Sequence, residues 1–299
     1  MKIKCFRIDG LFDKYSFQSK FDKKVNIIVG NNGTYKSTVL DILRYVIWYG
    51  DVPSVVFRTA SISFSNGMEV TSATSDFSIN KSGYDMGLHV RYITKDEIKI
   101  SSEEYLKGLK FDYISTFDIK DKDTNTQETF LDKRLVKLQS DYGYYLNGLL
   151  KQLTGSLNAQ GNVTKKQFEQ IYKRKDLFIR LVNDAFKETG KVIDNDSEKL
   201  RFIIDDNTTI GADKLSSGEK QLLIILLTAL LEDGQEFILM MDEPEISLHI
   251  SWQYQLLNWI QLLNPNVQLI LTTHSPSIFS DGWGEKAIYM EDITKNTNE

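Results

Sequence analysis

A short loop between an apolar strand and an apolar helix constrains the fold of this chain more than any other feature. Residues 25–29 (VNIIV) have the character of a buried strand, and residues 39–47 carry apolar side chains at helical spacing. The loop that joins them contains Gly30, Asn31, Asn32, Gly33, Thr34, Tyr35, Lys36, Ser37 and Thr38. In such a strand–loop–helix unit, the N–H groups of the loop and of the helix start converge on an anion. The segment therefore predicts a phosphate site in an α/β fold.

The residue types in this loop fit a nucleoside triphosphate with its magnesium ion. The segment follows the phosphate-loop pattern G-x-x-x-x-G-K-[ST], and we expect residues 31–38 to hold ATP. Lys36 is expected to place its ammonium group at the β- and γ-phosphates, and Ser37 to offer its hydroxyl to Mg²⁺. Tyr35 stands where the phosphate loop usually has glycine, so its ring must point away from the phosphates and is expected to reduce affinity or rate. A plain turn followed by a helix cap is the alternative interpretation.

Two acids follow a second apolar strand. Residues 237–241 (FILMM) read as a strand that is buried on both faces, and Asp242 and Glu243 come directly after it. Because the carboxyl ends of parallel strands face the ligand crevice, we expect Asp242 to hold Mg²⁺ through water and Glu243 to orient or deprotonate the attacking water. Two buried acids without a cation would be costly, which argues against a purely structural role.

A histidine ends the next buried strand, at residues 267–272. His274 is expected to reach the γ-phosphate, although a single histidine is more often structural. A further segment, residues 215–221 (LSSGEKQ), opens an apolar helix. There Ser216 and Gly218 are expected to present N–H groups to a second anion. An ordinary serine cap, with Glu219 completing a capping box, is compatible with that role.

Together, GNNGTYKST, LSSGEKQ, FILMMDEPEISLH and LILTTHS resemble the Walker A, signature, Walker B and switch-histidine motifs of ABC-type ATPases. The variant resembles that of chromosome-maintenance, RecF-like and bacterial anti-phage (overcoming-lysogenisation-type) ATPases, over residues 1–50 and 200–290. The resemblance implies an α/β fold: an ABC-type ATPase head with a mixed or parallel sheet, an antiparallel β layer and a helical insertion. It also implies ATP hydrolysis by a head-to-tail dimer or higher oligomer. In such a dimer Ser216 and Gly218 of one subunit contact the γ-phosphate held by Lys36 of the other.

The resemblance also suggests roles for several residues outside the four motifs. His249 stands where transporters usually have an aspartate, and it matches the RecF-like and anti-phage branch instead. A strand at residues 113–118 is our candidate for the segment before the glutamine that joins the two lobes, and Gln127 for that glutamine. Phe12 or Tyr15 is the candidate for stacking on adenine.

The domain organisation is predicted from changes in the spacing of apolar residues along the chain. A strand-rich antiparallel layer is predicted within residues 54–100, helices at 131–153 and 164–187, and a strand at 201–204 that opens a βαβ run. We therefore expect an N-terminal ATPase lobe at 1–130, a helical insertion at 131–195 and a C-terminal ATPase lobe at 196–299.

Composition limits the classes of partner and the compartment that we expect for this chain. The net charge is −5 and the pI is near 5.4, so any nucleic-acid contact must be local. A single cysteine, Cys5, and the lack of a signal-like N-terminus favour a cytoplasmic protein. The longest apolar run, residues 222–231, is too short to cross a bilayer, so no membrane contact is expected. The helix predicted at 164–187 has a basic face, which is either a solvated surface or a landing patch for nucleic acid or an acidic partner: Lys165, Lys166, Lys173, Arg174, Lys175 and Arg180.

Two functions remain open. The predicted helices are too short for long coiled-coil arms, and with 25 residues after His274 we expect no further nuclease domain. We therefore favour an ATP-driven dimerisation switch or sensor that controls a separate effector protein, in anti-phage defence. The alternative is a RecF-like, ATP-dependent DNA-binding protein of DNA repair or maintenance.

Overall fold

The chain forms two compact units. The computed structural model describes residues 1–48, 56–74, 89–115, 129–157, 161–195, 197, 199–205 and 208–296. The first unit, here called the sheet unit, combines Met1–Ser115, Glu236–Pro244 and Val267–Glu299, and the second, the helical unit, combines Thr116–Gln235 and Glu245–Asn266. These units do not coincide with the three segments expected from sequence, because three strands from the C-terminal part (residues 238–242, 268–273 and 287–289) join the sheet of the N-terminal part. The three-segment division stays a prediction.

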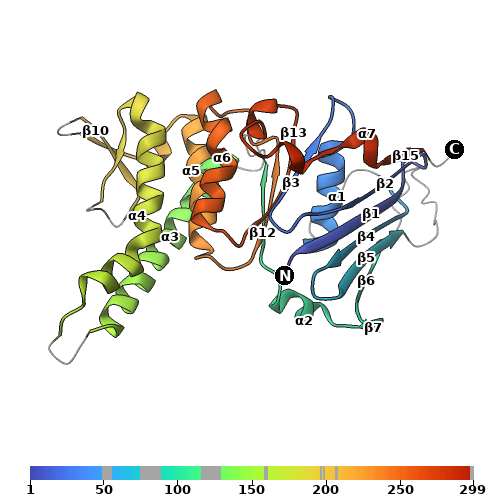
Figure 1. Cartoon of the computed structure of the whole chain (residues 1–299), viewed down its shortest axis with the longest axis horizontal. Helices are drawn as coiled ribbons and strands as arrows, with labels where there is room; N and C mark the ends of the chain where they lie inside the picture. Colours follow the sequence, from blue (N-terminus) through green and yellow to red (C-terminus); the bar gives the residue numbers. More distant parts are fainter. Residues whose placement is uncertain are drawn as a thin grey trace. The chain divides into compact units, whose positions relative to one another are not determined.

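The sheet unit is built around a five-stranded parallel sheet (Figure 1). Its order is β14-β3-β13-β12-β8, and every neighbouring pair is parallel. The strands are β3 (Val25–Val29), β8 (Phe111–Ser115), β12 (Ile238–Asp242), β13 (Gln268–Thr273) and β14 (Ala287–Tyr289). β12 and β13 are buried along their whole length, which confirms the parallel sheet predicted from their apolar runs. Residues 116–118 and Gln127 lie outside the described residues.

A second, antiparallel sheet completes this unit. Its order is β15-β2-β1-β4-β5-β6-β7. The strands are β1 (Ile3–Leu11), β2 (Tyr15–Lys20), β4 (Thr59–Phe64), β5 (Met68–Thr74), β6 (His89–Lys95), β7 (Ile98–Lys99) and β15 (Thr294–Asn296). The antiparallel layer expected within residues 54–100 is therefore confirmed where the structure describes it.

Helix α1 (Lys36–Trp48) packs against strands of both sheets, and its apolar side is fully buried there. Two short helices, α2 (Ser102–Lys107) and α7 (Met290–Ile293), also belong to this unit. Because α1 begins directly after the glycine- and asparagine-rich loop, its position in the core fixes where that loop lies.

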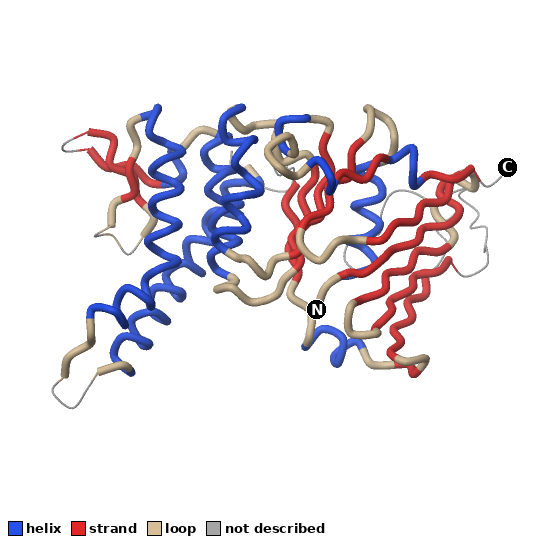
Figure 2. Tube along the Cα trace, in the orientation of Figure 1, coloured by secondary structure: helices blue, strands red, loops and turns tan. Residues whose placement is uncertain are grey.

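Four helices dominate the helical unit (Figure 2). They are α3 (Phe130–Gly155), α4 (Lys165–Phe186), α5 (Ser217–Leu231) and α6 (Ile250–Leu263). α3 and α4 confirm the two helices predicted in the insertion, and each begins with a capping box. α5 contacts the other three helices, which explains why residues 222–230 are apolar nearly all round. No helix in the described parts of the chain combines the length and apolarity that a bilayer crossing requires.

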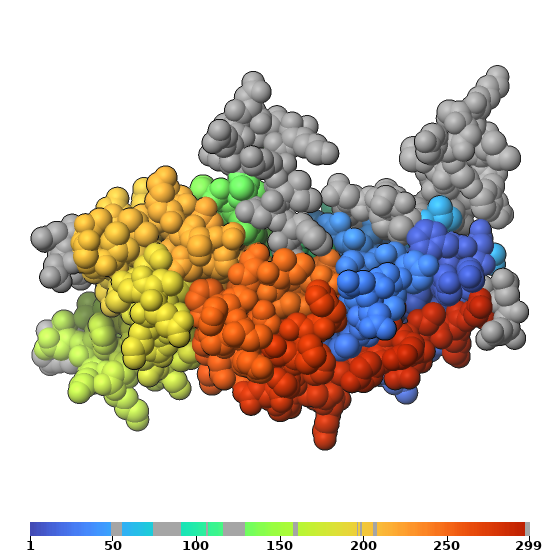
Figure 3. Space-filling view, turned by 90° about the horizontal axis from the view of Figure 1, so that it is seen from above, coloured from blue at the N-terminus to red at the C-terminus, as the bar shows by residue number. Residues whose placement is uncertain are grey.

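A small antiparallel sheet follows α4, after the short 3₁₀ helix η1 (Lys187–Thr189). It contains β9 (Val192–Ile193), β10 (Arg201–Asp205) and β11 (Thr208–Gly211). In the space-filling view, the yellow α4 and the gold segment after it form one continuous surface (Figure 3). The expectation that residues 201–204 open a βαβ run was wrong. Only Phe202 of β10 is buried, and such a half-exposed strand suits an antiparallel sheet with one wet face.

Candidate nucleotide site

The phosphate-loop candidate spans the gap between β3 and α1. β3 ends at Val29, and α1 begins at Lys36. Thr34 closes the loop on itself, because its N–H and its hydroxyl both donate to the Asn31 carbonyl, at 3.3 and 2.8 Å. Gly33 has φ +80°, a left-handed conformation that glycine adopts without strain. The first N–H groups of α1 lack partners within the helix and are available to an anion.

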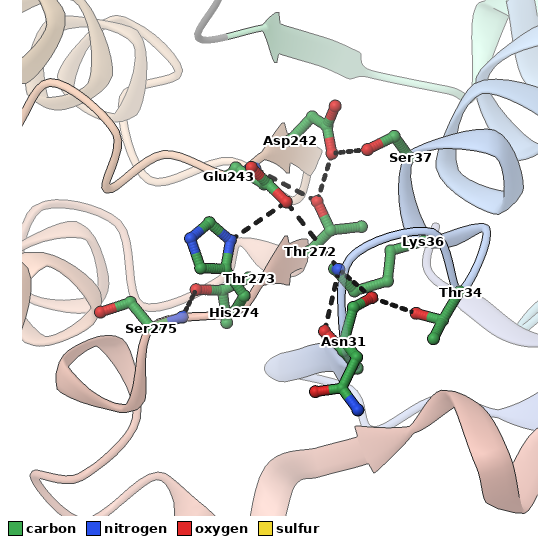
Figure 4. A network of polar contacts seen from close by, with 11 residues as sticks. Asn31, Thr34, Lys36, Ser37, Asp242, Glu243, Thr272, Thr273, His274 and Ser275 are labelled. Atoms are coloured by element: carbon green, nitrogen blue, oxygen red, sulfur yellow. Dashed lines mark hydrogen bonds and ion pairs between the residues drawn. The ribbon is translucent and has the colours of Figure 1, made fainter.

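Lys36 is almost fully buried, with a side chain that is only 4% exposed. Its Nζ donates to the carbonyl oxygens of Gly30 and Asn31, at 2.9 and 3.1 Å (Figure 4). The same nitrogen lies 3.9 Å from Oε1 of Glu243. The ammonium group is therefore held over the loop by neutral carbonyls, which phosphate oxygens can replace at an electrostatic gain.

Ser37 and Asp242 meet across the sheet unit, as a shared magnesium site requires. Ser37 Oγ donates to Asp242 Oδ1 at 2.9 Å, and Thr272 Oγ1 donates to the same oxygen. Burial raises the pKa of Asp242, and the nearby Glu243 charge adds to this, while hydrogen bonds from Thr272 and Ser37 and the Lys36 charge oppose it. A buried carboxyl group with a raised pKa is a position where a cation is favourable.

The donor set fits Mg²⁺, which prefers a few protein oxygens completed by water and phosphate oxygens. Ser37 and Asp242 supply one hydroxyl and one carboxylate. Within the described ranges, no three His, Cys, Asp or Glu side chains group together in a way that could hold a metal. The two protein donors alone would not form a cage, so a magnesium ion at this position would take its further ligands from water and from a bound phosphate group.

Glu243 lies between the loop lysine and the strand-end histidine. Its Oε1 is 3.2 Å from Nδ1 of His274, and its side chain is 15% exposed whereas that of His274 is 46% exposed. The Glu243 N–H donates to both the carbonyl and the hydroxyl oxygen of Thr272, at 3.0 and 3.1 Å. Glu243 has φ +45°, which costs on the order of 1–3 kcal/mol and is typical of functional sites. The carboxylate is thus aimed at the loop, with a solvent-facing histidine behind it (Figure 4).

Thr272, which no sequence pattern singled out, contacts both acids. β12 and β13 pair in parallel, with Asp242 directly opposite Thr272. The apolar runs revealed both strands but not their register. Aligning the ends of the two strands would have been the only signal for this threonine.

Tyr35, the residue that departs from the loop pattern, also has a positive φ, +68°. Its ring packs in an aromatic cluster, with ring centroids 5.6 Å from Phe12, 5.2 Å from Tyr15 and 6.4 Å from Phe17. Both candidates for adenine stacking are therefore neighbours of the Tyr35 ring. Their contact with a base stays a prediction.

The signature segment lies in the helical unit. Ser216 is the N-cap of α5, and its side chain accepts from the Glu219 N–H while Glu219 bonds back, so the expected capping box is present. Ser216 and Ser217 are exposed, whereas Gly218 is buried. Exposure leaves Ser216 accessible to a ligand from outside this unit. Its role and that of Gly218 at a γ-phosphate stay predictions.

A parallel sheet whose central strands end in a phosphate-type loop, two acids and a histidine defines the class of P-loop ATPase domains. The family model described as "AAA domain, putative AbiEii toxin, Type IV TA system" matches residues 25–280, and the chain belongs to this family. The expected membership of a P-loop ATPase group is thereby confirmed.

Individual relatives agree with the family. Septu protein PtuA from Bacillus thuringiensis is 26% identical over 298 residues, covering 92% of this chain and 72% of that protein. The Retron Vc95 probable ATPase from Vibrio cholerae serotype O1 biovar El Tor is 25% identical over 218 residues, covering 64% of this chain and 41% of that protein. The chain therefore spans less than half the length of the retron protein.

Solved structures confirm the fold. The SmcHead bound to the C-winged helix domain of ScpA matches with a TM-score of 0.55 and 12% identity, covering 94% of this chain and 92% of that one. The SMC head domain from Thermotoga maritima matches with a TM-score of 0.52 and 14% identity, over the same shares. The expected α/β ATPase-head fold, with a parallel sheet, an antiparallel layer and helices, is thereby confirmed.

Proposed function

We propose that this chain binds ATP with Mg²⁺ at residues 31–38 and hydrolyses the ATP. One observation carries the proposal: Ser37 and Asp242 are joined at 2.9 Å beside a line of polar groups that runs from the Lys36 ammonium through the Glu243 carboxylate to the His274 ring. A phosphate loop needs a cation, a magnesium ligand pair and a group that orients water, and these residues supply each of them.

The geometry supports a specific role for each residue. Lys36 neutralises charge on the β- and γ-phosphates. Ser37 and Asp242 would hold Mg²⁺, which would supply further positive charge at the same phosphates. Glu243 accepts a proton from the water whose oxygen attacks the γ-phosphorus, as the bond to the β-phosphate oxygen breaks. His274, 3.2 Å from Glu243, orients that carboxylate and reaches toward the γ-phosphate.

ATP would act as a bridge between two copies of the chain. Ser216, an exposed residue, caps the start of α5, where helix N–H groups favour an anion. In a head-to-tail dimer, this helix start would close over the triphosphate held by the loop of the other copy. A ligand that binds only the dimer stabilises it by mass action, so hydrolysis releases it.

The dimer would serve as a switch that controls a separate effector protein, in anti-phage defence in the cytoplasm. The similarity to Septu protein PtuA and to a retron ATPase supports this assignment. The site described here supplies a single ATP chemistry, which suits a regulator that signals through assembly.

The test uses two variants with opposite expected behaviour. Lys36→Ala should lose ATP binding, whereas Glu243→Gln should bind ATP, lose turnover and accumulate as a dimer in light scattering with ATP and Mg²⁺. Equal hydrolysis by the wild-type chain and Glu243→Gln would show that the base assignment is wrong. Pull-down with co-encoded proteins, with and without ATP, tests the effector, and failure to retain any of them counts against the switch.

A second candidate, an ATP-dependent DNA-binding protein, rests on the basic face of α4. Part of that charge is already compensated, because Arg174 pairs with Asp233 at 3.0 Å and Lys165 lies 3.8 Å from Glu169. This weakens the attraction for phosphates. Duplex DNA binding that needs ATP and falls steeply with salt would favour this candidate, and no binding at low salt with ATP would remove it.

A further inference from the structure

The carboxylate of Glu219 gathers more partners than a capping box needs. Oε2 accepts from the backbone N–H of Ser216 at 2.9 Å and from its hydroxyl at 3.0 Å. Oε1 accepts from the hydroxyl of Thr189 and from Nζ of Lys191, both at 2.8 Å. The Glu219 side chain is only 3% exposed and that of Lys191 19%. Burial opposes the charge of Glu219, yet the hydrogen bonds from Lys191, Ser216 and Thr189 outweigh it and hold the pKa below its ordinary value.

The next residue is tied to the other end of the insertion. Lys220 Nζ lies 2.6 Å from Oδ1 of Asp132, with side chains 14% and 24% exposed. Asp132 also completes the capping box of α3 with Thr129. Two consecutive residues of α5, the signature helix, therefore contact both ends of the helical insertion. These ends are the start of α3 and the segment that follows α4.

The Ser216 hydroxyl has only one proton, and in this structure it points to Glu219. To donate to a phosphate, the hydroxyl must turn away from that carboxylate. Glu219 then keeps three donors, two of which come from Thr189 and Lys191. Without the Lys191 ammonium, the buried Glu219 carboxylate would carry an unbalanced negative charge. It would then keep its hydrogen bond from the Ser216 hydroxyl and repel an approaching phosphate.

We propose that Lys191 and Thr189 are positioning residues that release the Ser216 hydroxyl to the triphosphate of a second copy by satisfying and neutralising Glu219. This proposal rests on the proposed ATP-bridged dimer, and it identifies residues that control how that dimer closes. Lys191 acts after the ATP has bound to the loop of the partner copy, so it affects closure and turnover but not the first binding step.

Through the same contacts, a movement of the helical insertion can change the position of Ser216. Thr189 and Lys191 lie in the segment that leaves α4, and Asp132 lies in the first turn of α3. A partner that shifts either helix moves an anchor of Glu219 or Lys220. The start of α5 is thereby a place where a contact on the insertion changes the competence for dimer closure.

The experiment measures ATP affinity, ATP-dependent dimerisation and turnover separately for the full chain. Lys191→Met should bind a fluorescent ATP analogue as the wild type does, but lose at least about tenfold in turnover and in dimer formation, the scale of one charge-assisted hydrogen bond. Lys191→Arg should retain most of both. The double variant Lys191→Met with Glu219→Gln should recover turnover, because a neutral amide no longer traps the serine proton. Lys187→Met, an exposed lysine in the same segment, is the matched control.

Thermal unfolding of each variant separates misfolding from loss of positioning, and the recovery in the double variant is a result that a purely structural role would not produce. A Lys191→Met chain that dimerises and turns over as the wild type does overturns the inference while the proposed function stands. Failure of the double variant to improve on Lys191→Met overturns it as well. A wild-type chain that never dimerises with ATP overturns the proposed function, and this inference with it.

Discussion

Gly218 and Ser247 approach so closely that a β-carbon on Gly218 would lie 2.2 Å from the backbone carbonyl oxygen of Ser247. Real β-carbons essentially never come within 3.0 Å of another heavy atom, and a backbone oxygen cannot rotate aside as a flexible side chain does. The glycine therefore lets the signature helix start pack on the segment that follows the two acids. The need for glycine here is steric, because Gly218 does not have a positive φ.

Gly218→Ala should therefore destabilise the chain by about 1–3 kcal/mol, the usual cost of overpacking. A loss of that size lowers the unfolding temperature by several degrees in a thermal melt. Gly148→Ala is the matched control, because a β-carbon at this helical glycine meets nothing within 4 Å and alanine favours the helix. Equal melting temperatures for Gly218→Ala and the wild type would contradict the steric role.

Tyr35→Gly should raise turnover and lower stability. Glycine relieves the left-handed strain at φ +68°, about 1–2 kcal/mol, and gives the loop the residue its pattern expects. The loss of contacts with Phe12, Tyr15 and Phe17, each worth about 0.5–1.5 kcal/mol, outweighs that gain in the folded state. Steady-state ATP hydrolysis and thermal unfolding check the two effects. Tyr35→Phe keeps the ring and should match the wild type in both, so a gain of turnover in Tyr35→Phe would point to the hydroxyl instead.

Thr272→Val should weaken the response to magnesium. The substitution keeps the side-chain shape but removes one of the two hydroxyls that donate to Asp242 Oδ1. We expect turnover to fall by about tenfold, as for one hydrogen bond to a charged group, and the Mg²⁺ concentration at half-maximal rate to rise. The measurement is a Mg²⁺ titration of ATP hydrolysis.

The control for Thr272→Val is Thr228→Val. Thr228 is also buried, but its hydroxyl has no hydrogen-bond partner among the residues that the structure describes, so valine should leave activity unchanged and stability equal or higher. Similar magnesium curves for Thr272→Val and the wild type would show that Thr272 does not tune Asp242.

Asp242→Asn should stabilise the nucleotide-free chain near neutral pH. The pKa of Asp242 is raised above its ordinary 3.8, chiefly by burial. A carboxyl group with a raised pKa binds its proton more readily in the folded chain. Its contribution to the free energy of unfolding therefore falls as pH rises from the ordinary value through the raised one. The asparagine variant lacks this loss, so its unfolding temperature should exceed that of the wild type above that interval.

Thermal melts across about pH 5 to about pH 8, without nucleotide, check the pH prediction. The exposed Asp292→Asn serves as the control for removing one negative charge. A wild-type unfolding temperature that equals or exceeds that of Asp242→Asn throughout would show that burial does not penalise the Asp242 charge.

Local patterns were sufficient for the central part of this protein. The strand at 25–29, the loop after it and the helix that starts at Lys36 are all encoded by neighbouring residues. Asp242, Glu243 and His274 were found for the same reason, since each stands at the end of a strand that apolar residues reveal, or directly after it. Because the carboxyl ends of parallel strands lie at one edge of a sheet, these residues could be predicted to lie close together.

Tertiary structure decided the contacts that join distant segments. Thr272 reaches Asp242 through the register of two strands, and Lys220 meets Asp132 across 88 positions. The assignment of 201–204 to a separate antiparallel sheet was likewise invisible in the sequence. Periodicity and capping signals describe how a segment folds locally, but many registers and pairings bury the same apolar surface. Which polar groups finally meet depends on how the whole core packs, and in this chain that packing places Lys191 and Thr189 on Glu219.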